Sequence, residues 1–180
     1  MVGFNFTRCI FDDNHAKMFF METKILNTYL SFRVGKETFA LNTGNVISIL
    51  EMKPITRIPE APDYVTGVIN FRGIALPIVD MRIALGFPIS EETPETAIIT
   101  TEFEFDQSTL KLGLLVDSLT GVFNLVPEEI LPAPELTNLK REWISGLVQN
   151  DDLFIQIINM AALMDHANHH WIQKFNQPVE

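Results

Sequence analysis

The sequence predicts a mainly β protein made of two similar halves, with a few short helices. Short runs of alternating apolar and polar residues recur along the chain, and glycine, proline and aspartate separate them. Two segments, residues 64–81 and 143–160, also resemble each other without a gap. Hydrophobic residues make up 47% of the chain and charged residues 20%, a composition typical of a folded domain.

The first half opens with a predicted hairpin. In its first strand, Leu30, Phe32 and Val34 share one side, and Gly35-Lys36 forms a two-residue turn because glycine adopts positive φ. Strands are predicted at residues 28–34, 37–42 and 44–52, and a proline-rich loop follows at 57–63.

Residues 64–81 predict a second hairpin, with Arg72 at its turn. Both faces of the returning strand are apolar, so we expect this strand to be buried on both sides. Pro77 cannot donate a hydrogen bond to a neighbouring strand, which predicts a bulge or an edge at that point. Asp80 then stands where it can cap a short helix at 81–85.

The second half repeats this plan. Strands are predicted at residues 96–105, 109–117 and 120–126, then one helical turn at 127–131, strands at 143–148 and 153–160, and a last helix from about Ala161.

The two aligned segments indicate a structural repeat. Gly67, Ile78 and Met81 are identical to Gly146, Ile157 and Met160, and most other pairs are chemically alike. Each copy follows a hairpin, a Thr-Gly dipeptide and a Pro-Glu loop, and each precedes a short helix. We therefore expect two β-rich halves, each too small to close its own core, that lean on each other.

The repeat singles out Arg72. The second copy turns through Asn150-Asp151-Asp152, which are ordinary turn residues, whereas the first turns through Phe71-Arg72-Gly73. The architecture therefore does not demand an arginine at this turn. Arg72 is either a solvated turn residue or a side chain that meets a partner's carboxylate or carbonyl, since arginine is enriched at interface hot spots.

Composition excludes several classes of protein. The net charge of −10 argues against nucleic acid as a partner. Cys9 is the only cysteine, so no internal disulfide can form, which fits the cytosol. No apolar run approaches the roughly 18 residues that span a bilayer, so we expect no membrane insertion. Residues 1–26 do not read as a signal peptide and predict a loosely held N-terminal extension.

No phosphate-binding loop, nucleophile elbow or zinc-protease motif occurs, so we expect neither catalysis nor a cofactor. The segment "DHANHH" places His166 and His170 four residues apart on the last helix, a spacing that can hold zinc or nickel. No third ligand is specified, so a solvated helix face is the main interpretation and a metal site the alternative. A barrel that binds a small ligand between the halves also stays open.

Four segments, in order, resemble the CheW family, the adaptors of bacterial chemotaxis. "ITRIPEAPDYVTGVINFRGIALPIVDMR" resembles the hallmark stretch of that family, and "GLLVDSLTGV", "EEILPAP" and "WISGL" fall where its later landmarks stand. The resemblance covers residues 27–168, which leaves residues 169–180 as a C-terminal tail. It implies two five-stranded SH3-like β-barrels that share a core.

The resemblance also implies a function. Such adaptors are not enzymes; they couple methyl-accepting chemoreceptors to the histidine kinase CheA, whose regulatory domain has the same fold, in cytoplasmic arrays under the membrane. Carried over to this sequence, the implied partner-binding residues are Val46, Ile49, Arg72 and Gly113, with Phe71 beside the turn arginine. Gly67 matches a structural glycine, and we expect Gly73 and Gly146 to be structural as well.

Ser48 departs from the family, which commonly has a glutamate at that position. We keep Ser48 within the expected partner-binding set, although the missing carboxylate puts the usual receptor or kinase contact in doubt. The departure predicts a divergent adaptor, for which a parallel chemosensory system, such as one that controls pili, is the alternative to receptor–CheA coupling.

Overall fold

The computed structural model describes residues 27–105, 107–133, 143–150 and 153–166. Its strands are β1 (Asn27–Val34), β2 (Glu37–Asn42), β3 (Val46–Glu51), β4 (Val65–Phe71), β5 (Ile74–Asp80), β6 (Ala97–Phe105), β7 (Ser108–Val116), β8 (Ser118–Leu125), β9 (Ile144–Asn150) and β10 (Leu153–Ile158). The helices are α1 (Met81–Ala84) and α2 (Met160–His166), with 3-10 turns η1 (Thr43–Asn45) and η2 (Pro127–Glu129). The expected extension 1–26 and tail 169–180 lie outside the described residues. In the described part of the chain, no helix is both long and apolar enough to cross a membrane.

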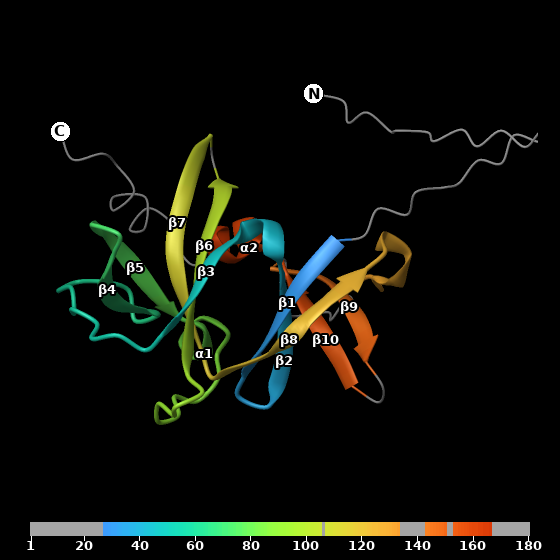
Figure 1. Ribbon diagram of the computed structural model, residues 1–180, viewed down its shortest axis with the longest axis horizontal. Coiled ribbons are helices and arrows are strands. Elements are labelled where there is room, and N and C mark those ends of the chain that lie inside the picture. Colours follow the sequence, from blue (N-terminus) through green and yellow to red (C-terminus); the bar gives the residue numbers. More distant parts are fainter. Residues whose placement is uncertain (1–26, 106, 134–142, 151–152, 167–180) are drawn as a thin grey trace, which may run out of the picture.

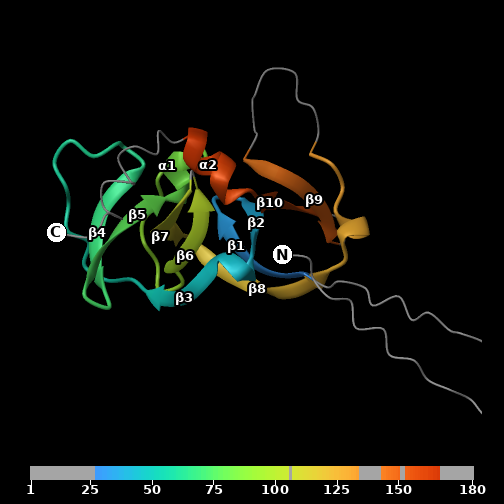
Figure 2. The ribbon, with the colours of Figure 1, turned by 90° about the horizontal axis from the view of Figure 1, so that it is seen from above.

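The strands form two five-stranded curled sheets, which confirms the mainly β fold expected from the sequence. One sheet has the order β3-β6-β7-β5-β4 and the other β8-β1-β2-β10-β9. We call the first sheet with α1 the central module and the second sheet with α2 the terminal module. The two sheets lie side by side along the longest axis of the molecule (Figure 1 and Figure 2).

The two halves of the sequence do not coincide with the two modules. The β1–β2 hairpin of the first half pairs with β8 and β10, and the β6–β7 hairpin of the second half pairs with β3 and β5. Adding five to each strand number, cyclically through the ten strands, converts one sheet order into the other. Each module therefore contains a hairpin from the other half of the chain, and through this exchange each half completes the sheet of the other.

The repeat aligned in the sequence has a structural counterpart. Ile69, Leu76 and Ile78 form part of a small apolar cluster in the central module, and their aligned partners Val148, Ile155 and Ile157 form part of one in the terminal module. The flanking Thr-Gly dipeptides, by contrast, are not equivalent, because Thr43-Gly44 lies in η1 whereas Thr120-Gly121 lies within β8.

The same close backbone approach occurs in both copies. Thr56 bridges Val68 in the central module, and Leu131 bridges Leu147 in the terminal module. Each bridge lies next to the glycine that the two copies share: a Cβ on Gly146 would lie 2.8 Å from the carbonyl oxygen of Leu131. Both Gly67 and Gly146 therefore stand where a larger side chain would collide with a neighbouring segment.

Neither the edge nor the bulge expected at Pro77 is found at that residue: β5 lies between β4 and β7, and Pro77 pairs with Val68 in regular register. The irregularity of this hairpin lies nearby, between Val65 and Gly67 on β4. The returning strand is buried from Leu76 onward, whereas Ile74 at the hairpin end is 47% exposed.

The largest apolar cluster draws on both modules. Phe32 and Leu41 enter it from the terminal sheet, Leu112 and Leu114 from the central sheet, and Met164 from α2. All five are almost completely buried. Neither module closes this cluster alone, so the two modules depend on one shared core.

Candidate docking surface

The β4–β5 hairpin ends in a tight turn that presents Arg72 to solvent. Phe71 pairs with Ile74, so Arg72 and Gly73 alone form the turn. Both have positive φ, 54° for Arg72 and 88° for Gly73, as a two-residue type I′ turn requires. Asn70 holds the turn, because its Oδ1 accepts a hydrogen bond of 2.9 Å from the backbone nitrogen of Gly73.

Arginine is an unfavourable residue for this turn. The left-handed conformation costs a residue with a Cβ roughly 1–2 kcal/mol, and asparagine and aspartate tolerate it best. In the other copy the sequence supplies Asp151 and Asp152 between the paired residues Asn150 and Leu153. Strain of this kind collects at functional positions. The backbone of Arg72 thus favours a role for its side chain outside the fold.

Phe71 and Gly113 lie beneath the surface rather than on it. Phe71 is 7% exposed, and the Cζ of Arg72 lies 5.1 Å from the centroid of its ring, so the ring supports the guanidinium from below. Gly113 is buried in β7, where a Cβ would stand 2.5 Å from Cδ1 of Ile78. Both positions are therefore packed against the core, whereas Arg72, at the turn, is exposed.

The other expected partner-binding residues lie on β3, at the edge of the central sheet. Ile49 is 45% exposed, while Val46 and Ser48 are half-buried on either side of a β-bulge. The backbone nitrogen of Ser48 donates to Oγ1 of Thr100 at 3.0 Å, and that hydroxyl donates to the backbone oxygen of Ser48 at 2.9 Å. The hydroxyl oxygen of Ser48 also lies 3.0 Å from Oγ1 of Thr100. Ser48 is therefore bound to the buried Thr100 within the sheet, and Ile49 is the exposed apolar residue of this strand.

The β9–β10 hairpin presents apolar side chains at the equivalent end of the terminal module. Leu153 is 72% exposed and Phe154 is 49% exposed. Leu153 occupies the position of Ile74 in the repeat. The β4–β5 and β9–β10 hairpins lie at opposite ends of the molecule (Figure 1 and Figure 2). Large apolar side chains exposed together are typical of protein interaction sites.

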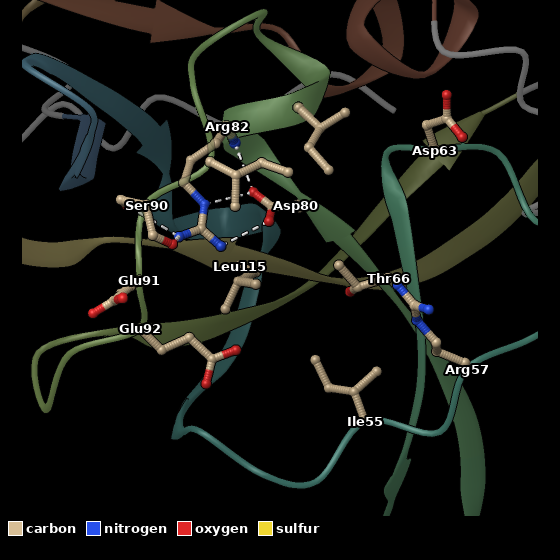
Figure 3. A pocket seen from close by; sticks show the side chains of 12 residues that line it. Ile55, Arg57, Asp63, Thr66, Asp80, Arg82, Ser90, Glu91, Glu92 and Leu115 are labelled. Carbon is tan, nitrogen blue, oxygen red and sulfur yellow. Dashed lines mark hydrogen bonds and ion pairs between the residues drawn. The ribbon is translucent and has the colours of Figure 1, made fainter.

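A hollow of about 730 Å³ opens on the central module (Figure 3). Side chains of both charges and several aliphatic residues line it: Ile55, Arg57, Asp63, Thr66, Asp80, Arg82, Ile83, Ile89, Ser90, Glu91, Glu92 and Leu115. Arg57 and Glu92 lie across the hollow from each other, and Asp80 pairs with Arg82 (Figure 3).

The charged pair in this hollow is saturated by contacts within the protein. Asp80 and Arg82 are 2% and 3% exposed, and Nε and Nη2 of Arg82 donate to the two carboxylate oxygens of Asp80 at 2.9 and 2.7 Å. Nη1 of Arg82 donates to the backbone oxygen of Ser90 at 2.8 Å and lies 3.5 Å from Oδ1 of Asp117. The hydrogen bonds to Asp80 raise the pKa of Arg82 above its usual value, so this group stays charged.

The sequence predicted only the capping role of Asp80, which the structure shows as a 2.9 Å hydrogen bond from the backbone nitrogen of Arg82. Sequence reasoning did not predict the contacts of Arg82. The repeat could have indicated them, because Asp80 and Arg82 align with Asn159 and Ala161, so only the first copy has the charged pair.

The alternative metal site cannot be built from the described residues. His166 ends α2, but its side chain and the whole of His170 lie outside the described part of the chain. Within residues 27–105, 107–133 and the described segments that follow, no group of three or more His, Cys, Asp or Glu side chains could hold a metal ion.

Comparison with known proteins gives one consistent result. The family described as CheW-like domain matches residues 28–168. The probable chemotaxis protein CheW of Rhizobium etli is 33% identical over 139 residues, which cover 77% of this chain and 87% of that protein. The chemotaxis protein CheW of Bacillus subtilis is 30% identical over 145 residues, or 80% and 90% of the two chains.

A solved structure is also similar. The scaffolding protein TtCheW of Thermoanaerobacter tengcongensis superimposes with a TM-score of 0.69 at 27% sequence identity. The match covers 78% of this chain and 94% of that one.

Proposed function

Because the chain belongs to the CheW-like family of chemotaxis scaffold adaptors, which are not enzymes, we propose that it couples chemoreceptors to the histidine kinase CheA. It acts in the cytoplasm, where the cytoplasmic tip of a receptor and the regulatory domain of the kinase bind it in membrane-associated arrays. Neither nucleic acid nor direct membrane insertion is part of this function.

The observation that carries the proposal is the backbone of Arg72. This residue is exposed and adopts φ of 54° at a turn for which the second copy of the repeat uses aspartates. The fold therefore retains an arginine that its own stability does not favour. A guanidinium held rigidly at a hairpin end, on the ring of Phe71, can bind a carboxylate or carbonyl group of a partner with two donors.

An adaptor that joins two partners needs two surfaces that do not overlap. The end of the central module, with Arg72 and Ile74, supplies one such surface, and Leu153 with Phe154 supplies another at the far end of the molecule. The first surface combines charge with apolar area and the second is mainly apolar. We assign one partner to each end.

The test measures binding of the CheA regulatory domain and of a receptor tip by isothermal titration calorimetry. Arg72→Asn is the informative variant, because Asn-Gly is the preferred pair in a type I′ turn and the hairpin stays intact. We expect it to lose about 1–3 kcal/mol of binding energy toward one partner, which is the share of an interface anchor. The paired variant Leu153→Ser with Phe154→Ser should weaken binding of the other partner.

Lys36→Asn is the matched control, because Lys36 is an exposed cation in the two-residue turn between β1 and β2. It should bind both partners as the wild type does. Wild-type affinity of Arg72→Asn for both partners would show that the assigned contact is wrong.

A divergent adaptor in a parallel chemosensory system is the second candidate, and Ser48 is the observation that favours it. The chain is also 26% identical to the protein FrzA of Myxococcus xanthus over 141 residues. Binding to a panel of CheA kinases separates the two candidates. Ser48→Glu should increase affinity for kinases of the flagellar pathway if coupling there is impaired by the missing carboxylate, with Ser48→Ala as the control.

A metal site at His166 and His170 remains the alternative outside the adaptor function. Calorimetric titration of the untagged protein with zinc decides it, and we expect no stoichiometric binding, because a pair of histidines supplies only two of the four ligands that zinc takes.

A further inference from the structure

Asp117 stands between the two modules in the chain and in space. It is the single residue between the end of β7 in the central module and the start of β8 in the terminal module. Its backbone nitrogen donates to the oxygen of Arg33 at 3.0 Å, and its Oδ2 accepts from the backbone nitrogen of Gly35 at 2.6 Å. One side of Asp117 is thus bound to the β1–β2 hairpin of the terminal module.

The other carboxylate oxygen of Asp117 faces the central module. Oδ1 accepts a hydrogen bond of 3.3 Å from Oγ of Ser90 and lies 3.5 Å from Nη1 of the buried Arg82. Arg82 is in turn held by both oxygens of Asp80 at the end of β5. A continuous path of charged and polar contacts therefore runs from the β1–β2 turn, through Asp117, to the base of the β4–β5 hairpin.

The repeat shows that this path is not needed to build the corner between strand and helix. In the second copy, Asn159 and Ala161 stand in place of Asp80 and Arg82. Asn159 still caps its helix, because its Oδ1 accepts from the backbone nitrogen of Ala162 at 3.2 Å. The corner forms without an ion pair, so the charges at Asp80 and Arg82 serve the link to Ser90 and Asp117.

Apolar packing in the shared core constrains the angle between the modules less sharply than directional contacts do. Apolar contacts are non-directional, and a core can shift by small sliding of packed elements. Hydrogen bonds are directional, and Asp117 makes them to both modules: it accepts at 2.6 Å from Gly35 and at 3.3 Å from Ser90. It also forms an ion pair of 3.5 Å with Nη1 of Arg82, whose guanidinium both oxygens of Asp80 hold in place within the central module. Directional contacts that join the modules are therefore the ones that can hold a single angle.

We propose that Asp117 is a positioning residue: with Arg82 and Ser90 it clamps the terminal module to the central module at one orientation. The clamp presents the Arg72 end and the Leu153–Phe154 end at a fixed geometry to two partners. This last step rests on the proposed adaptor function, whereas the clamp itself does not.

Distance measurements between spin labels test the clamp without any partner. The labels are attached to two introduced cysteines, Glu51→Cys on β3 and Thr120→Cys on β8. Both positions are exposed and lie in different modules, and Cys9→Ser removes the native cysteine. We expect one narrow distance distribution in the otherwise unchanged protein and a broadened or shifted distribution after Asp117→Ala. Glu95→Ala is the matched control, because it removes the exposed Arg33–Glu95 ion pair of 3.6 Å beside the same junction. It should leave the distribution unchanged.

A lower Tm of Asp117→Ala with an unchanged distance distribution would overturn the proposal, since a merely structural residue has that effect. If Asp117→Ala does not fold, Asp117→Asn and Ser90→Ala are judged by the same criterion, because each removes part of the clamp and leaves Asp80 and Arg82 paired. Asp117→Glu, which keeps the charge, should restore more of the narrow distribution than Asp117→Asn.

Binding measurements connect the clamp to the adaptor function. The affinity of Asp117→Ala for the kinase domain alone and for the receptor tip alone should lie within about twofold of the wild-type affinity. The amount of three-component complex that it forms should be at least tenfold lower. Normal three-component assembly by a variant with a broadened distribution would contradict the positioning role. If wild-type protein binds neither partner, the proposed function fails while the distance measurement still decides the clamp.

Discussion

Gly67 and Thr56 pack backbone against backbone: a Cβ on Gly67 would lie 2.2 Å from the carbonyl oxygen of Thr56. Gly67 also has φ of 148°, which a residue with a Cβ rarely adopts. Thr56 and Val68 exchange two hydrogen bonds of 2.9 Å beside this glycine, and the segment after β3 is thereby joined to β4. The contact closes the curled sheet that carries Arg72.

Gly67→Ala should therefore lower the free energy of unfolding by about 3 kcal/mol or more, because the backbone of Thr56 must move and its bridge to Val68 must break. Urea unfolding followed by circular dichroism measures the change. Gly121→Ala is the control, since its Cβ would find its nearest neighbour at 3.9 Å, and it should change stability by less than about 0.5 kcal/mol. Equal stability of the two variants would rule out the close approach at Gly67.

Arg72→Asn should raise the stability of the protein by about 0.5 kcal/mol. Asparagine tolerates the left-handed backbone better than arginine, and this gain exceeds the loss of an exposed cation–π contact with Phe71, which contributes about 0.5 kcal/mol. The same chemical unfolding experiment measures the effect. A clear loss of stability would mean that Arg72 serves the fold and would contradict its role in docking.

Thr100→Val should destabilise the protein by about 1–2 kcal/mol, whereas Ser48→Ala should cost less than about 0.5 kcal/mol. Valine has the shape of threonine, so no cavity forms, but the backbone nitrogen and oxygen of Ser48 lose their shared partner at the bulge. Ser48→Ala leaves both backbone contacts in place. Thermal or urea unfolding of the two variants gives the comparison, and the reverse order would show that the Ser48 hydroxyl, not Thr100, holds β3.

At alkaline pH the wild type should lose free energy of unfolding because of Tyr64, and Tyr64→Phe should abolish that part of the loss. Burial raises the pKa of Tyr64, and its hydroxyl has no hydrogen-bond partner among the described residues. Below pH 10 the tyrosine is protonated in both states. Above pH 10 the unfolded state releases the proton first, so the free energy of unfolding of the wild type falls until the pH passes the raised pKa.

The Tyr64→Phe variant lacks this group, so its stability should decline less between pH 9 and pH 11 in urea unfolding experiments. At pH 7 the variant should be more stable by up to about 1 kcal/mol, because an unpaired buried hydroxyl is removed. Identical alkaline profiles for the two proteins would show that Tyr64 is not buried as a neutral phenol.

Local pattern was sufficient for the elements of the fold. The alternation in residues 28–34 and the turn at Gly35-Lys36 act within a few residues, so the β1–β2 hairpin follows from the sequence alone. The same holds for the turn at Arg72, where comparison of the two copies also showed that the arginine was not required. What local pattern could not supply was its positive φ and its place above Phe71.

The sequence by itself determined the strands, the turns, the repeat and the family. Only the tertiary structure decided that β1–β2 joins β8 and β10 while β6–β7 joins β3 and β5. Both hairpins place apolar residues in the shared core, and local pattern does not specify which neighbouring strands each hairpin pairs with. The contacts of Asp117 could not be predicted for the same reason: Gly35 is far in the chain from Arg82 and Ser90, and only the packed modules bring all three to one carboxylate.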